Sequence, residues 1–268
     1  MSQYQPPVVM TIAGFDPSGG AGILADIKAI SAMGGFGVAA ISSLTFQNTL
    51  GVFGATYQTA ETLRRQIEPL LEDFQIAAVK TGMLPTAEVI EEIAAIISNR
   101  RLVPLVVDPV VRSTSGFDLI DDRALAVLVE KLFPLATVVT PNAAEAERLT
   151  GIRITNLETM QQAAAAIRSM GAHAVLVKGG DLLAETATDL LLNDDGARLF
   201  AAERVASSST HGTGCTLAAA MATLLARGHS LAEAIEQAKR YIVEAIRNAP
   251  ALGHGHGPLN HFPQGNNS

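Results

Sequence analysis

The stretch "STHGTGCTLAAAMA", which begins at Ser209, contains the only cysteine of the chain, Cys215. This cysteine follows a Gly-Thr-Gly turn and precedes an alanine-rich run that favours a helix. The first N–H groups of a helix have no intrahelical partners, so they can bind an anion. The positive end of the helix dipole predicts a lowered pKa for a thiol in that turn. A thiolate there could take a proton from a substrate hydroxyl while the N–H groups stabilise a phosphoryl group in transfer. A small buried cysteine without a catalytic role is the alternative.

Two further segments have types of residue that suit a small polar ligand. "GFDPSGGAG", from Gly14 to Gly22, resembles a phosphate loop but lacks the lysine and Ser/Thr of a Walker sequence, so it could be only a tight strand-to-helix turn. Asp26 lies one turn into the following helix, where it could point toward the strand ends or into solvent. Gln47 offers a donor and an acceptor side by side and could pair with an aminopyrimidine edge, or bond its own backbone.

Acidic, amide and basic residues follow three other apolar runs. In "TPNAAEAERL", Asn142 and Glu145 could hold hydrated Mg²⁺ near nucleotide phosphates, or they could be ordinary helix-start residues. Asp108 in "VVDPVV" is a further carboxylate. Lys178 in "LVKGGD" is a cation beside glycines that could neutralise a polyphosphate.

An α/β scaffold must bring these residues together. Short apolar runs predict strands at 8–14, 37–45, 76–82, 103–109, 137–142 and 174–180, and helical periodicity predicts helices at 22–34, 86–100 and 156–171. This alternation predicts a doubly wound, mostly parallel sheet, whose ligands lie beyond the carboxyl ends of the strands. Residues 186–205 predict a hairpin around Asp195 and Gly196, and so an antiparallel edge. Without a linker or an internal repeat, we expect residues 1–268 to form one domain.

Composition excludes several other classes of protein. A net charge of -7 over 268 residues argues against a general nucleic-acid binder. A single cysteine excludes an internal disulfide and a thiolate zinc site. The histidines of "GHGHGPLNHF" lack the fixed spacing of a zinc site. Neither a secretion signal nor a transmembrane run is expected, so the predicted location is cytoplasmic.

Together these segments resemble the hydroxymethylpyrimidine/phosphomethylpyrimidine kinases of thiamine biosynthesis, in the ribokinase-like superfamily. The resemblance runs from Thr11 to Phe262 through "AGFDPSGGAGILADIKA", "QNTLGV", "KTGML", "VVDPV", "TPNAAEAERLTG", "VLVKGG", "THGTGCTLAAA" and "GHGHGPLNHF", in the family's order. It implies a three-layer sandwich with a mostly parallel central sheet, an antiparallel edge and helices on both faces. It also implies ATP-dependent phosphorylation of 4-amino-5-hydroxymethyl-2-methylpyrimidine and then of its monophosphate, usually by a homodimer.

The resemblance also implies roles for individual residues. Cys215 is then the catalytic cysteine, and its anion hole is formed by Gly212, Thr213 and Gly214. The residues expected at the pyrimidine are Gly14, Asp26, Gln47, Met83 and Val110. The residues expected on the ATP and magnesium side are Asp108, Asn142, Glu145 and Lys178, with Asp108 and Glu145 as metal ligands. Leu24, Arg112 and Asp181 depart from the family's usual residues.

Two competing functions fit the same residues. A pyridoxal or pyridoxine kinase would also transfer a phosphoryl group to a hydroxymethyl group. A non-catalytic sensor would bind the pyrimidine without consuming ATP, although the intact "GTGC" argues against it because a pure binder needs no base.

Overall fold

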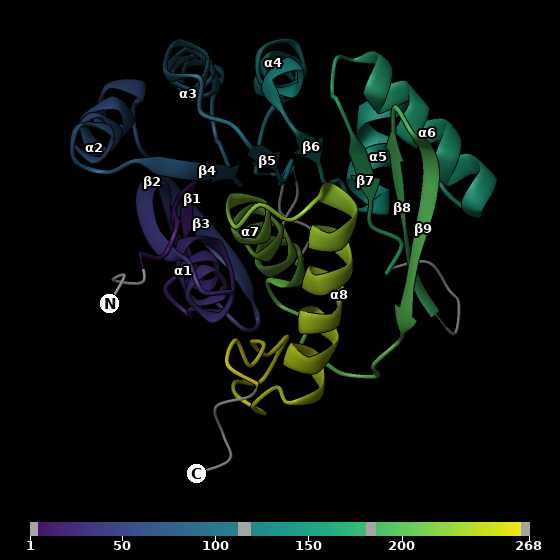
Figure 1. Cartoon of the computed structure of the whole chain (residues 1–268). Helices are drawn as coiled ribbons and strands as arrows, with labels where there is room; N and C mark the ends of the chain where they lie inside the picture. The colour runs from purple at the N-terminus through teal and green to yellow at the C-terminus, as the bar shows by residue number, and fades with distance from the viewer. Residues whose placement is uncertain (1–4, 112–118, 181–185, 264–268) are drawn as a thin grey trace.

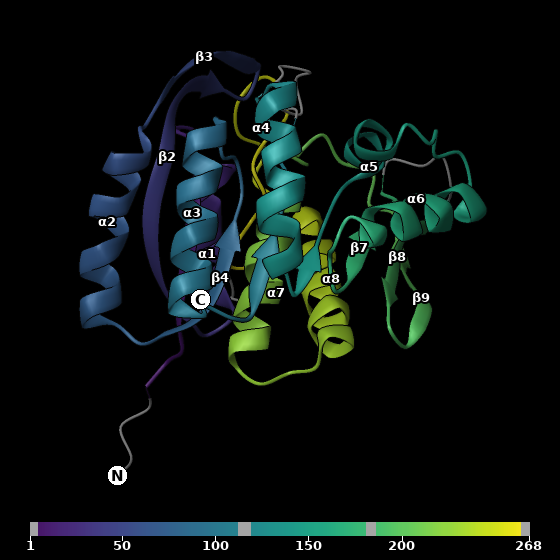
Figure 2. The same ribbon diagram turned by 90° about the horizontal axis from the view of Figure 1, so that it is seen from above.

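The structure is a computed structural model, and it describes residues 5–111, 119–180 and 186–263. A nine-stranded sheet in the order β3-β2-β1-β4-β5-β6-β7-β8-β9 runs through the molecule. Six neighbouring strands are parallel, namely β2, β1, β4, β5, β6 and β7. At one edge β3 is antiparallel to β2, and at the other edge β8 and β9 form an antiparallel hairpin beside β7. Two layers of helices cover the sheet (Figures 1 and 2). In the described part of the chain, none of the helices is long and apolar enough to cross a membrane.

The strands are β1 (Val8–Phe15), β2 (Phe36–Asn48), β3 (Gly51–Tyr57), β4 (Ile76–Thr81), β5 (Leu105–Val107), β6 (Val138–Val139), β7 (Val175–Val177), β8 (Thr186–Asn193) and β9 (Gly196–Glu203). The helices are α1 (Gly22–Ala32), α2 (Ala60–Asp73), α3 (Ala87–Arg100), α4 (Asp122–Val127), η1 (Leu128–Leu132), η2 (Phe133–Leu135), α5 (Ala143–Thr150), α6 (Leu157–Ser169), α7 (Thr213–Ala226) and α8 (Leu231–Arg247).

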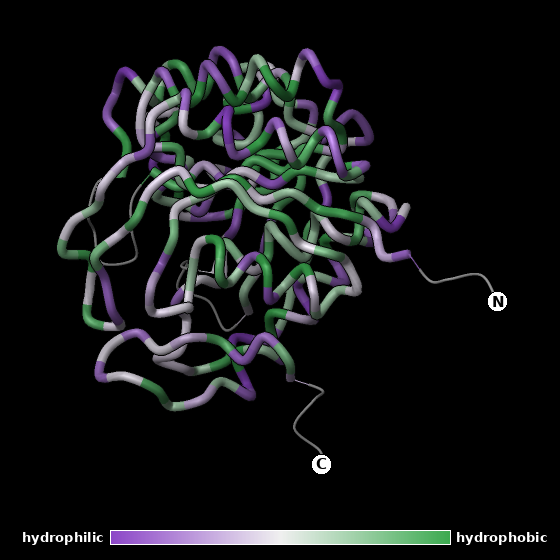
Figure 3. Tube along the Cα trace, turned by 90° about the vertical axis from the view of Figure 1, so that its left-hand side faces the viewer, coloured by the Kyte–Doolittle hydropathy of each residue, from purple (hydrophilic) through white to green (hydrophobic). Residues whose placement is uncertain are grey.

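Alternation along the strands divides the core into two layers. Met10 and Ile12 of β1 pack toward α2, α3 and α6, whereas Val9 packs toward α1, α7 and α8. Successive side chains of a strand point to opposite faces, so Thr11 continues the row begun by Val9 on the α7 side. The same alternation in β4 places Lys80 on the α7 side, after Ala78. Along the outer helices of Figure 3 the trace alternates between hydrophilic and hydrophobic, as expected for helices with one face on a sheet.

The α-helices differ in how their first turns are capped. The helices α2 to α6 and α8 each begin after a residue whose side chain accepts a backbone N–H of the first turn. By contrast, α1 begins after Ala21 and α7 after Gly212, and neither has a side-chain cap. Their first N–H groups therefore have partners other than a capping side chain: Gly22 donates to the Cys215 sulfur, and Thr213 donates to the carbonyl of Thr210 at 3.3 Å.

The structure confirms the expected architecture and extends it at one edge. The predicted hairpin is β8 and β9, and the predicted helices at 22–34, 86–100 and 156–171 are α1, α3 and α6. The second antiparallel edge, β3, was not predicted. As a result Gln47 lies inside the long strand β2, paired with Val52 of β3, and does not follow the strand as expected. The two departures at Arg112 and Asp181 lie outside the described residues.

Candidate active site

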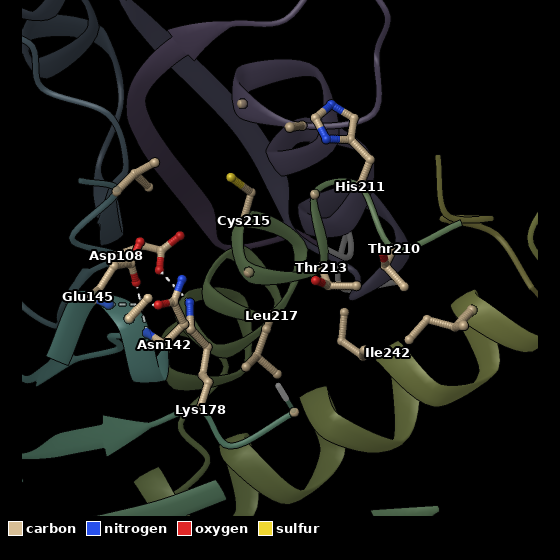
Figure 4. Close-up of a pocket in the computed structure, with 18 of the residues that line it drawn as sticks. Asp108, Asn142, Glu145, Lys178, Thr210, His211, Thr213, Cys215, Leu217 and Ile242 are labelled. Atoms are coloured by element: carbon tan, nitrogen blue, oxygen red, sulfur yellow. Dashed lines mark hydrogen bonds and ion pairs between the residues drawn. The ribbon is translucent and has the colours of Figure 1, made fainter. Parts of the chain in front are cut away.

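A cavity of about 1200 Å³ opens at the carboxyl ends of the parallel strands, between β2–β3, the α7 N-terminus and α8. It is lined by all but one of the residues expected at the site. The lining includes Gly14, Gln47, Met83, Asp108, Val110, Asn142, Glu145, Lys178, Gly212, Thr213, Gly214 and Cys215. In Figure 4, Asp108, Asn142, Glu145 and Lys178 gather on one side of Cys215, and Thr210, His211 and Thr213 lie on the other. The topology thus brings together residues that are far apart in sequence.

The Gly-Thr-Gly turn has the close backbone approach that its glycines suggested. Gly212 has a φ of 80°, and a Cβ atom there would lie 1.9 Å from the carbonyl oxygen of Gly20. A Cβ atom on Gly214 would lie 3.0 Å from Nζ of Lys178 and 3.7 Å from Oδ2 of Asp108. The turn therefore lies against both the glycine loop before α1 and the charged residues of the opposite wall. Gly212 has to be glycine, whereas a side chain at Gly214 would require Lys178 to move.

Cys215 lies in the first turn of α7, is partly buried and lines the cavity. It accepts a hydrogen bond from the backbone N–H of Gly22, the first residue of α1. Burial nevertheless raises the pKa of the thiol to about 11, with Lys80 opposing the rise and the Asp26 and Asp108 carboxylates adding to it. The lowered pKa expected from the helix dipole is therefore wrong, because the cost of burying a charge exceeds the gain from the N–H groups.

Lys178 and Asp108 form a buried ion pair on the other wall. Lys178 Nζ lies 2.9 Å from Asp108 Oδ1, which also accepts a hydrogen bond of 3.0 Å from the hydroxyl of Thr140. Burial alone would lower the pKa of Lys178, but the Asp108 and Glu145 carboxylates outweigh it and hold the pKa above its usual value. The lysine is therefore a cation at neutral pH, ready to interact with phosphate oxygens.

Asn142 and Glu145 form a capping box at the start of α5. The Asn142 side chain accepts the N–H of Glu145, and the Glu145 carboxylate accepts the N–H of Asn142, each at 2.8 Å. The ordinary helix-start role is thus present in the structure. Burial raises the pKa of Glu145 to about 7; Lys178 opposes this rise and Asp108 adds to it. The carboxylate faces the cavity beside Asp108 (Figure 4).

The residues expected at the pyrimidine lie at the β1, β2 and β4 end of the cavity, with one exception. Gly14 and Met83 are neighbours, because a Cβ atom on Gly14 would lie 3.2 Å from the Met83 sulfur. Gln47 and Val110 also line this end. Asp26 is fully buried and is not among the lining residues; its contact with the pyrimidine stays a prediction.

One hydrogen-bonded pair and two ion pairs near the cavity were not anticipated from the sequence. Asp16 accepts hydrogen bonds from Ser18 and Ala21 and lies 2.9 Å from Nε2 of His211, so it ties the glycine loop to the segment before α7. The other two pairs are Lys239 with Asp189, 2.5 Å apart, and Lys80 with Asp26, 2.8 Å apart. A lysine inside the apolar run "IAAVKTG" was a usable signal for the last pair, since a buried lysine needs an acidic partner.

A family model described as phosphomethylpyrimidine kinase matches residues 16–260. The chain is 48% identical over 254 residues to the thiamine biosynthesis bifunctional protein ThiED of Geobacter sulfurreducens. That match covers 95% of this chain and 52% of the relative, so the chain spans about half of that protein's length. The chain is also 44% identical over 269 residues to the hydroxymethylpyrimidine/phosphomethylpyrimidine kinase of Bacillus subtilis, covering 100% of this chain and 98% of the relative.

Among solved structures, the ADP complex of Bacillus subtilis pyridoxal kinase superposes with a TM-score of 0.88 at 35% identity. The superposition covers 96% of this chain and 98% of that one. It agrees with the layered sheet described above. Because the family model and the curated relatives match nearly the whole length of this sequence, the chain belongs to the phosphomethylpyrimidine kinase family.

Proposed function

We propose that this chain is an ATP-dependent kinase of thiamine biosynthesis, which phosphorylates 4-amino-5-hydroxymethyl-2-methylpyrimidine and then its monophosphate. One observation carries the proposal: Cys215 and the Lys178–Asp108 pair line one cavity, and the Gly-Thr-Gly turn lines the same cavity directly before Cys215. A hydroxyl acceptor needs a base, and a phosphoryl donor needs N–H groups and a cation. The cavity supplies both, and the name of the Bacillus subtilis relative supports the choice of the hydroxymethyl pyrimidine and its monophosphate as substrates.

In the first transfer, the hydroxyl oxygen of the pyrimidine attacks the γ-phosphorus of ATP. The new O–P bond forms as the bond from phosphorus to the β–γ bridging oxygen breaks, and ADP leaves with that electron pair. The hydroxyl proton passes to the thiolate form of Cys215. The N–H groups of Gly212 and Gly214 stabilise the oxygens of the transferred group, and Lys178 neutralises charge beside them. The N–H of Thr213 donates to the carbonyl of Thr210 at 3.3 Å, so it joins them only by exchanging that bond for a phosphoryl oxygen.

The second transfer differs in its need for a base. Its acceptor is a phosphate monoester, whose second pKa is about 6, so the attacking oxygen is largely deprotonated at neutral pH. Cys215 then has no acceptor proton to remove, while the anion hole and Lys178 keep their functions. We therefore assign Cys215 as the base of the first transfer.

The donor set of the cavity fits Mg²⁺. Within the described residues, there is no cluster of three or more His, Cys, Asp or Glu that could hold a metal ion. Mg²⁺ needs fewer protein ligands, because it keeps several waters and binds through one or two carboxylates plus substrate phosphates. Asp108 and Glu145 supply those two carboxylates, with Asn142 beside them. When bound, Mg²⁺ would neutralise charge on the phosphate oxygens of ATP.

The two ends of the cavity suit the two substrates. Gln47, beside Gly14, Met83 and Val110, offers its amide to the aminopyrimidine ring. The opposite end has the apolar side chains of Leu217 and Ile242 (Figure 4), against which the adenine ring of ATP would pack. Cys215 lies between the two ends, where the hydroxymethyl group and the γ-phosphate would meet.

The test is ATP consumption with Mg²⁺ and, in turn, the hydroxymethyl pyrimidine, its monophosphate and pyridoxal, with the products resolved. We expect the diphosphate to form through the monophosphate. Turnover of pyridoxal alone would favour a pyridoxal or pyridoxine kinase, the alternative that the similarity to the Bacillus subtilis pyridoxal kinase supports. Pyrimidine binding without consumption of ATP would instead indicate a sensor.

We propose further that the enzyme is a cytoplasmic homodimer of a single ribokinase-like domain. One continuous sheet contains every described strand, which supports one domain. The outer face of the β2–β3 hairpin exposes Phe46 and Phe53 to 55% and 70%, and Leu44 and Tyr57 are exposed on the same hairpin. A second copy of the chain is the occupant that we propose for this apolar face. Dependence on ATP supports a cytoplasmic location.

A further inference from the structure

Lys80 is a completely enclosed cation in the middle of the sheet. Its side chain is 0% exposed, and its ammonium lies 2.8 Å from Oδ2 of Asp26, which is also 0% exposed. The same carboxylate oxygen accepts a hydrogen bond of 2.6 Å from the hydroxyl of Thr11. Thr11 and Lys80 are paired across β1 and β4, so both point to the α7 side of the sheet. A buried ion pair is poor evidence for stability as such, and its position is the more informative feature.

The position of the pair is set by α1 and the Cys215 sulfur. Gly22, which donates its N–H to that sulfur, and Asp26 are four residues apart in α1, so they lie on one face of the helix. The ion pair with Asp26 therefore places Lys80 one helical turn further along α1 than Gly22, the residue that contacts the thiol.

The Lys80 ammonium lies close to the cavity wall, because a Cβ atom on Gly82 would lie 2.8 Å from its Nζ and 3.0 Å from Cβ of Ala13, which lines the cavity with Cys215. Its charge favours the Cys215 thiolate, as does the charge of Lys178.

We propose that Lys80 is a positioning residue for phosphoryl transfer: anchored by Asp26 beneath the cavity floor, it provides the positive charge that faces the Cys215 sulfur when the thiolate forms. This inference rests on the proposed role of Cys215 as base. It gives Asp26 a function through Lys80, without contact with the pyrimidine.

Each charged group around the sulfur raises or lowers the pKa of the Cys215 thiol according to its own charge. Asp26 on α1 and Asp108 after β5 disfavour the thiolate, and Lys178 after β7 interacts with it as a second cation. Burial alone would lower the pKa of Lys80, but Asp26 outweighs it, with contributions from Cys215 and Asp108, and holds the pKa above its usual value. Lys80 is thus charged whenever a proton leaves Cys215. Removing Lys80 raises the thiol pKa, whereas neutralising Asp26 lowers it.

Lys80 and Asp26 are expected to change the thiol pKa in opposite directions. A purely structural role of the ion pair would not produce opposite changes, so the two roles can be distinguished by experiment. Cys215 is the only cysteine, so alkylation of the intact protein by iodoacetamide reports on this thiol alone. The rate is measured against pH in wild type, Lys80→Met and Asp26→Asn. At a pH below the thiol pKa, a change of one unit in that pKa changes the thiolate fraction about tenfold. We expect alkylation at pH 8 to be about tenfold slower in Lys80→Met and severalfold faster in Asp26→Asn.

Both variants break the same ion pair, so a loss of packing would move both rates in one direction, and that result would overturn the proposal. Lys80→Met leaves a buried carboxylate and could fail to fold. Replacing both partners of a buried pair is better tolerated. If Lys80→Met does not fold, the double variant Lys80→Met/Asp26→Asn can therefore be used to test the role of Lys80. In it, the thiol should react more slowly than in Asp26→Asn, and equal rates would contradict the role of Lys80.

The outcome for Lys80 is separable from the outcome for the proposed function. Turnover of the hydroxymethyl pyrimidine by Cys215→Ser tests whether the thiol is the base, and it needs no change at Lys80. Opposite alkylation shifts together with full turnover in Cys215→Ser would leave the electrostatic effect in place and reject the base. Unchanged alkylation together with a strong loss in Cys215→Ser would keep the base and reject Lys80.

Discussion

At Cys215, burial raises the pKa of the thiol, and the positively charged and N–H groups near the sulfur lower it. Burial raises the thiol pKa to about 11, while the Lys80 ammonium and the Gly22 N–H favour the thiolate. The thiolate is therefore a minor species at neutral pH, but a strong base once formed. This balance suits a step in which a hydroxyl gives up its proton only as the phosphoryl group arrives.

We predict that Cys215→Ser lowers the first transfer about 10²–10⁴-fold, the usual contribution of a general base. The second transfer should change far less, because its acceptor oxygen is already deprotonated. Product formation from the hydroxymethyl pyrimidine and from its monophosphate, measured in the same preparation, makes each reaction the control for the other. Equal losses in both would show that Cys215 is not specifically the base of the first step.

Gln47→Ala should weaken binding of the pyrimidine more than binding of ATP, because Gln47 lines the cavity from β2, at the end where we propose that the pyrimidine binds. Losing a hydrogen bond to a neutral ring costs about 1 kcal/mol, or about fivefold in affinity. Calorimetric titration with each ligand measures the difference. Gln66→Ala is the matched control, since the Gln66 amide bonds the backbone of Ile41 and does not line the cavity. Equal weakening of both ligands in Gln47→Ala would place Gln47 outside the ring site.

At the scale of elements, the β2–β3 hairpin has two different faces. Thr45, Gln47 and Val52 line the cavity, whereas Phe46 and Phe53 point to the other side and are exposed. Large apolar side chains gathered on one exposed face are typical of an interaction surface. The hairpin can therefore connect the substrate site with a second copy of the chain.

Phe53→Glu should dissociate the proposed dimer, because a charge would then be buried in an apolar interface. Sedimentation velocity at micromolar concentration measures the change, and we expect wild type to sediment as a dimer and the variant as a monomer. Leu199→Glu is the control, since Leu199 is 48% exposed on β9, at the edge of the sheet opposite β3. A wild-type monomer, or dissociation by both variants, would contradict the proposed interface.

At the scale of the whole molecule, the C-terminal segment joins the hairpin to the catalytic turn. The backbone N–H of His256 donates to the carbonyl of Thr49, between β2 and β3, and the N–H of His211 donates to Gly257. His261 is buried, with Nε2 3.2 Å from the hydroxyl of Thr216 in α7. Tyr241 of α8 donates to the carbonyl of His261. The segment is therefore a structural tie between distant parts of the site.

We predict that His261 makes the fold sensitive to acid. Burial, with a contribution from Lys28, lowers its pKa from 6.5 to about 4. Between these values the unfolded chain binds more protons than the folded one, so the free energy of unfolding falls as the pH falls from about 6.5 to about 4. At about 1.4 kcal/mol per pKa unit, the loss is about 3 kcal/mol.

Urea unfolding at pH 7 and pH 4.5 measures this loss. His261→Gln should reduce the difference in the free energy of unfolding between the two pH values, because glutamine does not titrate. An unchanged difference in His261→Gln would show that other groups dominate the acid sensitivity.

The sequence by itself determined the six parallel strands, the helices α1, α3 and α6, the β8–β9 hairpin and the Gly-Thr-Gly-Cys turn, because these depend on periodicity, capping residues and glycines close together in the chain. It also placed Asp108 and Lys178 at the ends of apolar strands, which parallel pairing brings to one edge. Only the tertiary structure decided the thiol pKa, the enclosure of Asp26 and the pairing of Lys80, because burial and ion pairing depend on which elements pack together. The strand β3 escaped prediction for the same reason: its pairing with β2 is a tertiary contact that its own short sequence does not specify.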